Sequence, residues 1–283
     1  MPRIDLKTPT EIRRMRQAGL VVAQVHAALR AECRPGITQR ELDQIVTDVT
    51  RAAGAEPNFL NYHGFSGSVC ISVNDVIVHG IPSDDALKKG DLVSFDCGAV
   101  LTVDGEEWHS DAAFTMFVGG TPQGATGKRA AELNDVTEQS MWAGIAALAS
   151  ARRVGDVGAA IEDYVAAAGA KIGWEPGIIE GYTGHGIGRH LHEDPTVYNY
   201  RTRGRTERVR PGLVICIEPM LVAGQIDTRV LDDEWAVVTA DGQMASHWEH
   251  TVAVLDDGIS VLTAPDGGVA GLAPFGITPI LLD

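Results

Sequence analysis

The spacing of apolar residues over the first fifty positions predicts two helices. Thr8 and Glu11 form a capping-box pattern around Pro9, and proline suits the first position of a helix. Thr38 and Glu41 repeat the capping box before the second helix. The apolar residues that follow the two caps recur every three or four positions: Ile12, Met15, Gly19, Val22, Val25 and Leu29, then Leu42, Ile45, Val46 and Val49.

The pattern changes to that of strands between residues 58 and 120, where short runs of β-branched and aromatic residues alternate with turn residues. Helical spacing returns over about 125–150 and 155–169, and most of the chain after Gly184 is again predicted to be strand. The order of helix, helix and strands therefore occurs twice. Leu42 aligns with Ile161 and Val46 with Val165 at a constant offset of 119, which suggests an internal duplication.

These elements predict one compact α+β domain that covers residues 1–261. No low-complexity linker separates its two halves. Two such halves facing each other would leave a cleft between their sheets. The remaining segment, 262–283, is rich in glycine, proline and alanine, and we predict that it is a loosely packed tail.

Composition and charge exclude several classes of protein. No apolar run approaches the ~20 residues needed to span a bilayer, and Met1 to Lys7 do not form a signal peptide, so we expect a cytoplasmic protein without membrane contact. The net charge of -15 disfavours DNA and any broad nucleic-acid surface. One basic segment departs from this trend, and it is either a solvated loop or an RNA-backbone contact. Its arginines are Arg201, Arg203, Arg205, Arg208 and Arg210.

The four cysteines predict reduced, buried thiols. They are widely spaced and none belongs to a Cys-x-x-Cys pair. A disulfide framework or a thiolate metal site is therefore disfavoured.

Two aspartates give the first chemical signal. Asp104-Gly105 is a strong two-residue hairpin turn, and pairing the flanking strands around it places Asp96 opposite Ala113 and Asp111 opposite Gly98. Asp96 and Asp111 then become diagonal neighbours on one face of the ribbon. Carboxylates that converge in an apolar sheet need a proton or a cation between them. The alternative is one surface aspartate and one that is salt-bridged.

The second half of the chain supplies further candidate ligands. His185 lies among glycines beside a turn and is followed by His192, and Glu218 ends an apolar strand before Pro219. Glu249 is predicted to stand within the strand WEHTVAVL, where a glutamate is costly unless it is paired or ligating. Oxygen-rich ligands with one imidazole and no thiolate suit Mn, Fe, Co or Zn. Four carboxylates balance two divalent ions, which together can activate a water for amide hydrolysis.

With these residues, the chain resembles the type I methionine aminopeptidases, which have the pita-bread fold. The resemblance covers roughly residues 8–260. The stretches that carry it are YHGFSGSVCISVNDVIVHGIP, GDLVSFDCGAV, HSDAAFTMFVG, GHGIGRHLHEDP, ICIEPML and HWEHTVAV. It implies two pseudo-symmetric halves whose central antiparallel sheets enclose a dinuclear metal site, and removal of the initiator methionine from nascent chains when the second residue is small.

The resemblance also implies a role for each ligand. Asp96 would chelate one ion, His185 and Glu218 would bind the other, and Asp111 and Glu249 would bridge both. Glu218 would in addition transfer protons to and from the bridging water.

The resemblance further implies a set of residues that contact the substrate. His79 would position the substrate, and His192 would donate to the scissile carbonyl oxygen. His63 would lie behind the residues that contact the substrate directly. The methionine pocket would be small and apolar. The residues expected in the pocket are Phe59, Tyr62, Phe65, Cys70, Leu191 and Trp235.

Three finer expectations follow from the same resemblance. Asn74 and Val76 match a backbone loop that holds a monovalent cation. The span from Asp96 to Asp111 is about four residues longer than is usual, an even number that preserves the face of each aspartate. His190 stands where the family commonly has glycine.

The rival functions are a proline-specific aminopeptidase or dipeptidase of the same fold and a non-catalytic, ribosome-associated relative. The first usually carries a large N-terminal domain, which we do not expect here, and the second would have lost metal ligands. The family expectation is a monomer whose partners are nascent polypeptide N-termini. The basic segment is the candidate surface for a transient ribosome contact.

Overall fold

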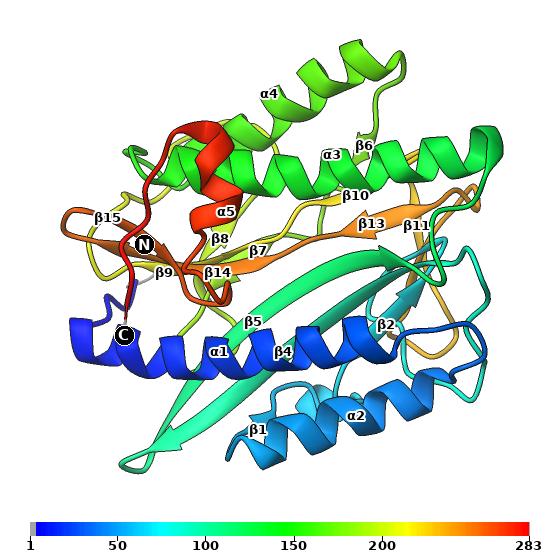
Figure 1. Cartoon of the computed structure of the whole chain (residues 1–283). Helices are drawn as coiled ribbons and strands as arrows, with labels where there is room; N and C mark the ends of the chain where they lie inside the picture. The colour runs from blue at the N-terminus through cyan, green and yellow to red at the C-terminus, as the bar shows by residue number, and fades with distance from the viewer. Residues whose placement is uncertain (1–3, 283) are drawn as a thin grey trace.

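The computed structural model describes residues 4–282, so Met1 to Arg3 of the predicted domain and Asp283 of the predicted tail lie outside the described residues. Figure 1 shows two helical layers with strands between them. Both predicted capping boxes are confirmed, since Thr8 caps α1 (Pro9–Glu32) and Thr38 caps α2 (Gln39–Ala52). The second helical pair is confirmed as well, with α3 at Gly124–Leu148 and α4 at Gly155–Ile172.

The strands of the first half centre on one long hairpin. Its arms are β4 (Leu92–Val103) and β5 (Glu106–Phe117), joined at Asp104 and Gly105, which both have positive φ as a type I′ turn requires. The predicted register is confirmed, because Asp96 pairs with Ala113 and Gly98 with Asp111. The other strands of this half are β1 (Glu56–Pro57), β2 (Cys70–Val73) and β3 (Val76–Val78).

The second half forms a five-stranded sheet with the order β15-β14-β9-β7-β8, together with two small three-stranded sheets. One small sheet has the order β11-β12-β3, which joins a strand of the first half to strands of the second. The strands are β6 (Gly177–Ile178), β7 (Gly184–Gly186), β8 (Glu193–Val197), β9 (Val214–Ile217), β10 (Met220–Val222), β11 (Thr228–Val230), β12 (Val237–Thr239), β13 (Ala245–His247), β14 (His250–Leu255) and β15 (Gly258–Val261).

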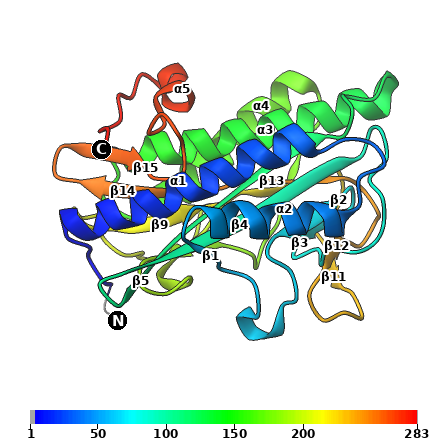
Figure 2. The same cartoon turned by 60° about the horizontal axis from the view of Figure 1, so that its bottom comes forward.

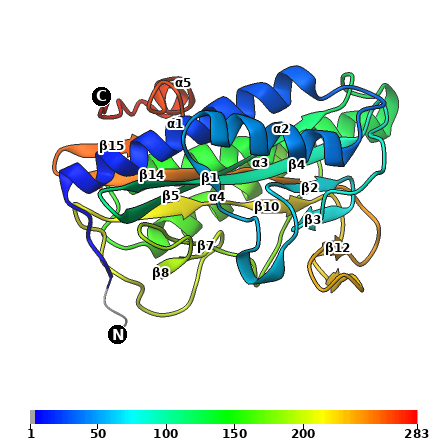
Figure 3. The same ribbon diagram turned by 90° about the horizontal axis from the view of Figure 1, so that it is seen from below.

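The helices cover the outer faces of the two halves. α1 packs on β4, β5 and α2, while α3 packs on α4 and on β13 (Figures 1 and 2). One buried apolar cluster includes Leu29, Phe95, Trp142 and Ile217, so it takes residues from both helical layers and both sets of strands. Both halves therefore contribute to a common core. Figure 3 shows that the β7–β8 region and the β11–β12 region both lie on the side away from α1.

The prediction of a loosely packed tail is wrong for its first part. Leu262 and Leu272 are fully buried, and the short helix α5 (Val269–Leu272) lies against α3. The buried Arg16 of α1 donates hydrogen bonds to the carbonyl oxygens of Leu262 (2.7 Å) and Pro265 (3.0 Å). The glycines and prolines of this segment indicate turns. Leu262, Leu272 and the distant Arg16 nevertheless pack it against the rest of the domain. A short 3-10 turn, Ala273–Phe275, follows α5.

Two smaller expectations can be compared with the structure. All four cysteines are buried free thiols, as predicted. Within residues 4–282, no helix has both the length and the apolar character needed to cross a membrane.

Candidate metal centre and active site

The two halves enclose a cavity of about 310 Å³ whose wall contains all the predicted metal ligands. Asp96 and Asp111 enter it from the first half, and His185, Glu218 and Glu249 enter from the second. The fold therefore brings together residues that are separated by up to about half of the chain. The sequence could rank each residue as a candidate, but only the facing sheets place them in one cavity.

The hairpin holds its two aspartates rigidly. Asp96 lies in the middle of β4, between β2 and β5. Asp111 is fixed through its backbone, because its N–H donates to the Thr251 hydroxyl (3.1 Å) and its carbonyl accepts from that hydroxyl (2.7 Å). Ligand atoms of Asp96, Asp111 and Glu249 all lie within 4.8 Å of one another. This is the convergence that the hairpin register predicted.

Glu249 does not stand within a strand, which corrects the prediction. It occupies the break between β13, which ends at His247, and β14, which begins at His250. There its N–H donates to the carbonyl oxygen of Ala113 (2.9 Å) and its carbonyl accepts from the Ala113 N–H (3.3 Å). The chain thus leaves one small sheet, pairs briefly with β5, and enters the five-stranded sheet. Local pattern could not show this change of partner.

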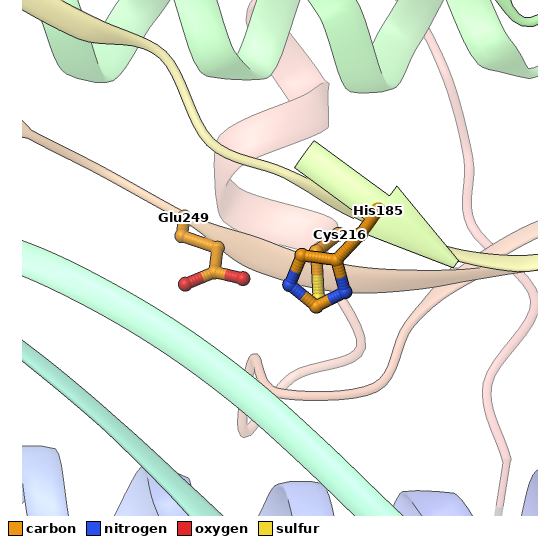
Figure 4. A group of neighbouring side chains, drawn as sticks. All are labelled: His185, Cys216 and Glu249. Atoms are coloured by element: carbon orange, nitrogen blue, oxygen red, sulfur yellow. The ribbon is translucent and has the colours of Figure 1, made fainter. Parts of the chain in front are cut away.

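His185 and Glu218 form the other side of the site. His185 lies in β7, where its Nδ1–H donates to the Gly186 carbonyl oxygen (2.9 Å) in the tautomer that leaves Nε2 unprotonated. Nε2 lies 3.5 Å from a carboxylate oxygen of Glu218. A second cluster of possible ligand atoms joins His185, Cys216 and Glu249, also within 4.8 Å (Figure 4). Glu249 is common to both clusters, so it lies between two potential ion positions.

Burial raises the pKa of every carboxyl group in this cluster, and repulsion between carboxylates adds to the effect at three of them. Burial raises the pKa of Asp111 to about 7. The pKa values of Asp96, Glu218 and Glu249 are raised well above their ordinary range, by burial first and then by neighbouring carboxylates. Four such groups cannot all ionise in a cavity of this kind without compensating positive charge. The four carboxyl groups therefore require protons or bound cations to lie together in this cavity.

The imidazoles around the cavity are held neutral. Burial lowers the pKa of His185 to about 3, and burial also lowers the pKa of His247 to about 3. The pKa values of His79 and His192 are lowered as well, by burial first and then by a neighbouring histidine. A neutral imidazole can ligate a metal through one nitrogen or donate one N–H to a substrate.

The unpaired polar atoms of the site fit divalent ions. One buried oxygen each of Asp96, Asp111 and Glu249 has no hydrogen-bond partner in the described structure, although buried polar groups normally have one. Oxygen donors with one imidazole are the ligand set that Mn, Fe, Co and Zn accept. Cys216 is a less suitable ligand, because burial and the adjacent carboxylates raise its pKa well above the ordinary value and keep it a thiol.

The expected substrate residues also line the cavity, with one exception. Phe65 packs edge-on against Trp235 (centroids 5.2 Å apart) and more loosely against Phe59 (6.4 Å). Cys70 pairs in register with Asp96, which sets the apolar pocket directly beside the carboxylates. The predicted residues found in the cavity wall are Phe59, Tyr62, Phe65, Cys70, His79, Leu191, His192 and Trp235.

His63 is the exception among the predicted substrate residues. It is absent from the cavity wall, and its exposed ring packs edge-on against Tyr62 (4.4 Å). Its backbone has a positive φ of 48°. His63 therefore lies behind Tyr62 and does not face the cavity itself.

Several residues of the wall were not predicted. His247 faces Glu218, with its Nε2 3.6 Å from a carboxylate oxygen, and this nitrogen has no hydrogen-bond partner in the described part of the chain. Its position two residues before Glu249, on one side of an extended chain, was a signal that could have indicated it. Val78, Tyr182, Thr183 and Met220 complete the unpredicted side chains of the wall. They come from loops and short strands without a distinctive local pattern.

Comparison with known proteins identifies the class to which this fold and site belong. Residues 13–256 match the metallopeptidase family M24, and the chain belongs to that family. Several of its most similar relatives are methionine aminopeptidases. Methionine aminopeptidase 1 of Mycobacterium tuberculosis is 49% identical over 92% of this chain and 95% of its own. Methionine aminopeptidase 1 of Bacillus subtilis is 39% identical over 92% of this chain and 99% of its own.

Solved structures agree on the fold. The methionine aminopeptidase of Thermotoga maritima superposes with a TM-score of 0.83 at 36% identity, covering 92% of this chain and 99% of that one. The prolidase of Pyrococcus furiosus has a TM-score of 0.70 at 21% identity, with coverage of 92% and 65%, and shows the shared fold alone. The predicted pita-bread fold is thus confirmed, and membership of a metallopeptidase family supports divalent metal binding at the acidic cavity.

Proposed function

We propose that this protein removes the initiator methionine from new protein chains by metal-dependent hydrolysis of the first peptide bond. The observation that carries the proposal is the acidic cluster beside a small aromatic pocket. The chain's similarity to methionine aminopeptidases over nearly their whole length supports the same activity. We further propose that cleavage occurs only when the second residue of the substrate is small.

Two divalent ions would occupy the cavity, and Co, Mn, Fe and Zn all suit the ligands. Asp96 would hold one ion, His185 and Glu218 would hold the other, and Asp111 and Glu249 would contribute to both. The sharing of Glu249 between the two clusters of ligand atoms supports this division. When bound, two divalent ions would lower the pKa of a water and so supply a nucleophile near neutral pH.

The remaining chemistry belongs to the protein's own side chains. Glu218, whose carboxyl pKa is raised, accepts a proton from the attacking water and returns it to the leaving amine. His192 lies at the cavity mouth, where its Nε2–H donates to the scissile carbonyl oxygen as charge develops there. His79, between Tyr182 and Trp235, positions the substrate by its side chain.

The methionine side chain fills the aromatic part of the cavity. Phe65, Trp235 and the thiol of Cys70 suit a flexible thioether, which packs well against aromatic rings and sulfur. Phe59, Tyr62 and Leu191 close the pocket. A more open groove of about 660 Å³ shares Thr183, His185 and His192 with the cavity and gives room for the residues that follow the methionine.

Two finer parts of the proposal concern ions and partners. Asn74 has a positive φ of 58°, and together with Val76 it is proposed to hold a monovalent cation through backbone oxygens. The five arginines of the segment 201–210 are all exposed, which supports a transient contact with ribosomal RNA near the emerging chain. Arg201 pairs with Asp163 (2.7 Å), so Arg203 and Arg205 are better placed for that contact. We propose a cytoplasmic monomer.

Peptide hydrolysis by metal-free protein, titrated with Co, Mn or Fe, tests the proposal. Release of methionine from Met-Ala-Ser that depends on metal and is lost in Asp111→Ala supports both the reaction and the metal centre. Cleavage of Ala-Pro peptides in place of Met-Ala-Ser would instead favour the proline-specific enzymes of this fold. Folded protein that cleaves neither peptide with any metal would favour a non-catalytic binding protein.

Ribosome co-sedimentation at low and raised salt tests the partner proposal. Binding should weaken with salt and with the double change Arg203→Glu and Arg205→Glu. Reversal of the distant, exposed Arg40 to glutamate is the matched control. Binding that ignores both the salt and the double change would refute the arginine contact.

A further inference from the structure

The loop that carries His192 has little regular structure of its own. We define the His192 loop as residues 188–193, which lead from β7 into the first residue of β8. Its internal hydrogen bonds join Gly188 N–H to the His190 carbonyl (3.1 Å) and His190 N–H to a carboxylate oxygen of Glu193 (3.0 Å). The position of His192 over the cavity therefore depends on what holds this loop from outside.

The tip of the β4–β5 hairpin holds the loop on one side. The backbone N–H of His109 donates to the carbonyl oxygen of Gly188 (2.9 Å). The guanidinium of Arg189 donates to Glu106 of the tip (3.2 Å) and to Glu11 of α1 (2.7 Å). These contacts join three separate elements, the hairpin, the first helix and the His192 loop, around one arginine.

A buried tryptophan organises this junction. Trp108 is fully buried, and the Arg189 guanidinium lies 4.7 Å from its ring. Arg14 of α1 lies 5.7 Å from the same ring and pairs with Glu106 (3.3 Å), as well as with Asp104 at the turn. Figure 2 shows the hairpin tip beside the N-terminal end of α1. A planar guanidinium on an aromatic ring, with two carboxylates at its edge, has a fixed orientation.

The other side of the loop is held by the N-terminal segment. The ammonium group of Lys7, which is almost fully buried, pairs with the carboxylate of Glu193. The backbone N–H of Lys7 also donates to the Gly212 carbonyl (2.7 Å). The loop is thus held at Glu193 by the N-terminal segment, and at Gly188 and Arg189 by the hairpin tip together with Glu11 of α1.

We propose that the β4–β5 hairpin tip positions His192, with Arg189 as the positioning residue that transmits the contact. Arg189 does not line the cavity that contains the acidic cluster and the aromatic pocket, and we assign its effect on hydrolysis to the loop. It does line the open groove beside that cavity, so an exchange measurement made without substrate separates the positioning of the loop from contact with the substrate. The length of the hairpin arms explains this arrangement, because it brings Glu106 and Trp108 into contact with Arg189. The inference rests on the proposed function in one respect, the role of His192 in hydrolysis.

Steady-state kinetics of the Mn-loaded enzyme on Met-Ala-Ser provide the first test. Arg189→Ala should lower kcat about tenfold and leave KM within about twofold, because a displaced donor weakens the transition state more than binding. Glu106→Gln should have a smaller effect in the same direction, and Arg189→Lys should recover part of the loss. Arg40→Ala, which removes an exposed pair with Asp84, should leave kcat unchanged.

Two further measurements separate positioning from a general loss of structure. In a His192→Ala background, Arg189→Ala should cause no additional loss of kcat, since residues that act through one another are not additive. Hydrogen–deuterium exchange of the metal-free protein should become faster over residues 186–194 in Arg189→Ala and in Glu106→Gln, but not in Arg40→Ala.

Either of two results would overturn the proposal: unchanged exchange in the His192 loop, or the same fold loss of kcat with and without His192. The exchange experiment needs no metal and no substrate. It therefore decides whether the tip holds the loop even if the wild-type protein fails to release methionine, a result that would count against the proposed function alone.

Discussion

Asp96 and Asp111 are diagonal neighbours on the β4–β5 ribbon, because Asp96 pairs with Ala113 and Asp111 pairs with Gly98. Their carboxylates reach the same ligand cluster, in which Glu249 from the other half is the third member. The hairpin thus provides one rigid side of the metal centre, and the crossing between β13 and β14 provides the other.

Replacement of Asp111 by asparagine should remove most of the activity and lower the metal content. The change keeps the shape of the side chain but removes the charge proposed to bridge two ions. We expect fewer than two Mn ions per chain by mass spectrometry and a loss of kcat of about 100-fold or more. Asp257→Asn, in an exposed turn, is the matched control. Full occupancy by two ions in Asp111→Asn would contradict the bridging role.

The stability of the metal-free protein should fall as the pH rises above about 6.5. The pKa of Asp111 is about 7 in the folded chain against 3.8 ordinarily, so the folded state binds more protons in that window and loses stability as they leave. His185 and His247, with pKa values lowered to about 3, act in the opposite direction, but only below their ordinary value of 6.5. Above pH 6.5 the carboxyl groups therefore determine whether stability rises or falls with pH.

Urea unfolding of metal-free protein between about pH 6.5 and 8 measures this dependence. Asp111→Asn should show a shallower decline than wild type, by about 1 kcal/mol per pH unit near pH 6.5 and by progressively less above pH 7, where Asp111 completes its ionisation. Parallel declines in the two proteins would show that Asp111 is already ionised without metal. Added Mn should flatten the wild-type curve, because bound cations replace the protons.

Removal of the Tyr62 hydroxyl should slow hydrolysis without weakening substrate binding. The hydroxyl lies 2.7 Å from Nδ1 of His192, and donation to Nδ1 leaves Nε2–H as the donor that faces the substrate. Loss of one such hydrogen bond should lower kcat by roughly three- to tenfold in Tyr62→Phe. The comparison is with Tyr164→Phe, which changes a hydroxyl outside the cavity wall. A rise in KM with unchanged kcat would instead assign Tyr62 to binding alone.

Loss of the Arg16 guanidinium should destabilise the whole chain. Arg16 is 5% exposed and donates to the carbonyl oxygens of Leu262, Ala264 and Pro265. Arg16→Met keeps most of the apolar stem but leaves these oxygens without a partner, which should cost about 2–4 kcal/mol in the free energy of unfolding. The exposed Arg13→Met serves as control. Equal urea midpoints for the two variants would mean that the C-terminal segment contributes little to stability.

Local pattern was sufficient for the elements whose causes are local. The capping boxes at Thr8 and Thr38 start α1 and α2 as expected, because a side chain satisfies backbone groups three residues away. The Asp104-Gly105 turn set the register of the hairpin, since a two-residue turn leaves one pairing and side chains alternate along it. The neighbourhood of Asp96 and Asp111 therefore followed from the sequence without any knowledge of the fold.

Other features depended on partners distant in the chain. Glu249 lies in a break that exists because the chain exchanges one sheet for another and pairs with Ala113 between them. Residues after 261 are packed because Arg16, about 250 positions earlier, donates hydrogen bonds to the carbonyl oxygens of Leu262, Ala264 and Pro265. Cys216 and His247 belong to the site because strand pairing within the second half, β9 with β14 and β10 with β13, brings them to Glu249 and Glu218.

The sequence by itself determined the helices, the hairpin register and the kind of ion that the acidic residues suit, because backbone capping, turn geometry and ligand chemistry act over a few residues or within one side chain. The tertiary structure alone decided which of these residues share a cavity, how strongly their carboxyl pKa values are raised, and what holds His192 over it. Burial, repulsion between carboxylates and the contacts of Arg189 arise only when distant segments of the chain pack together. Local sequence patterns do not show which segments do so.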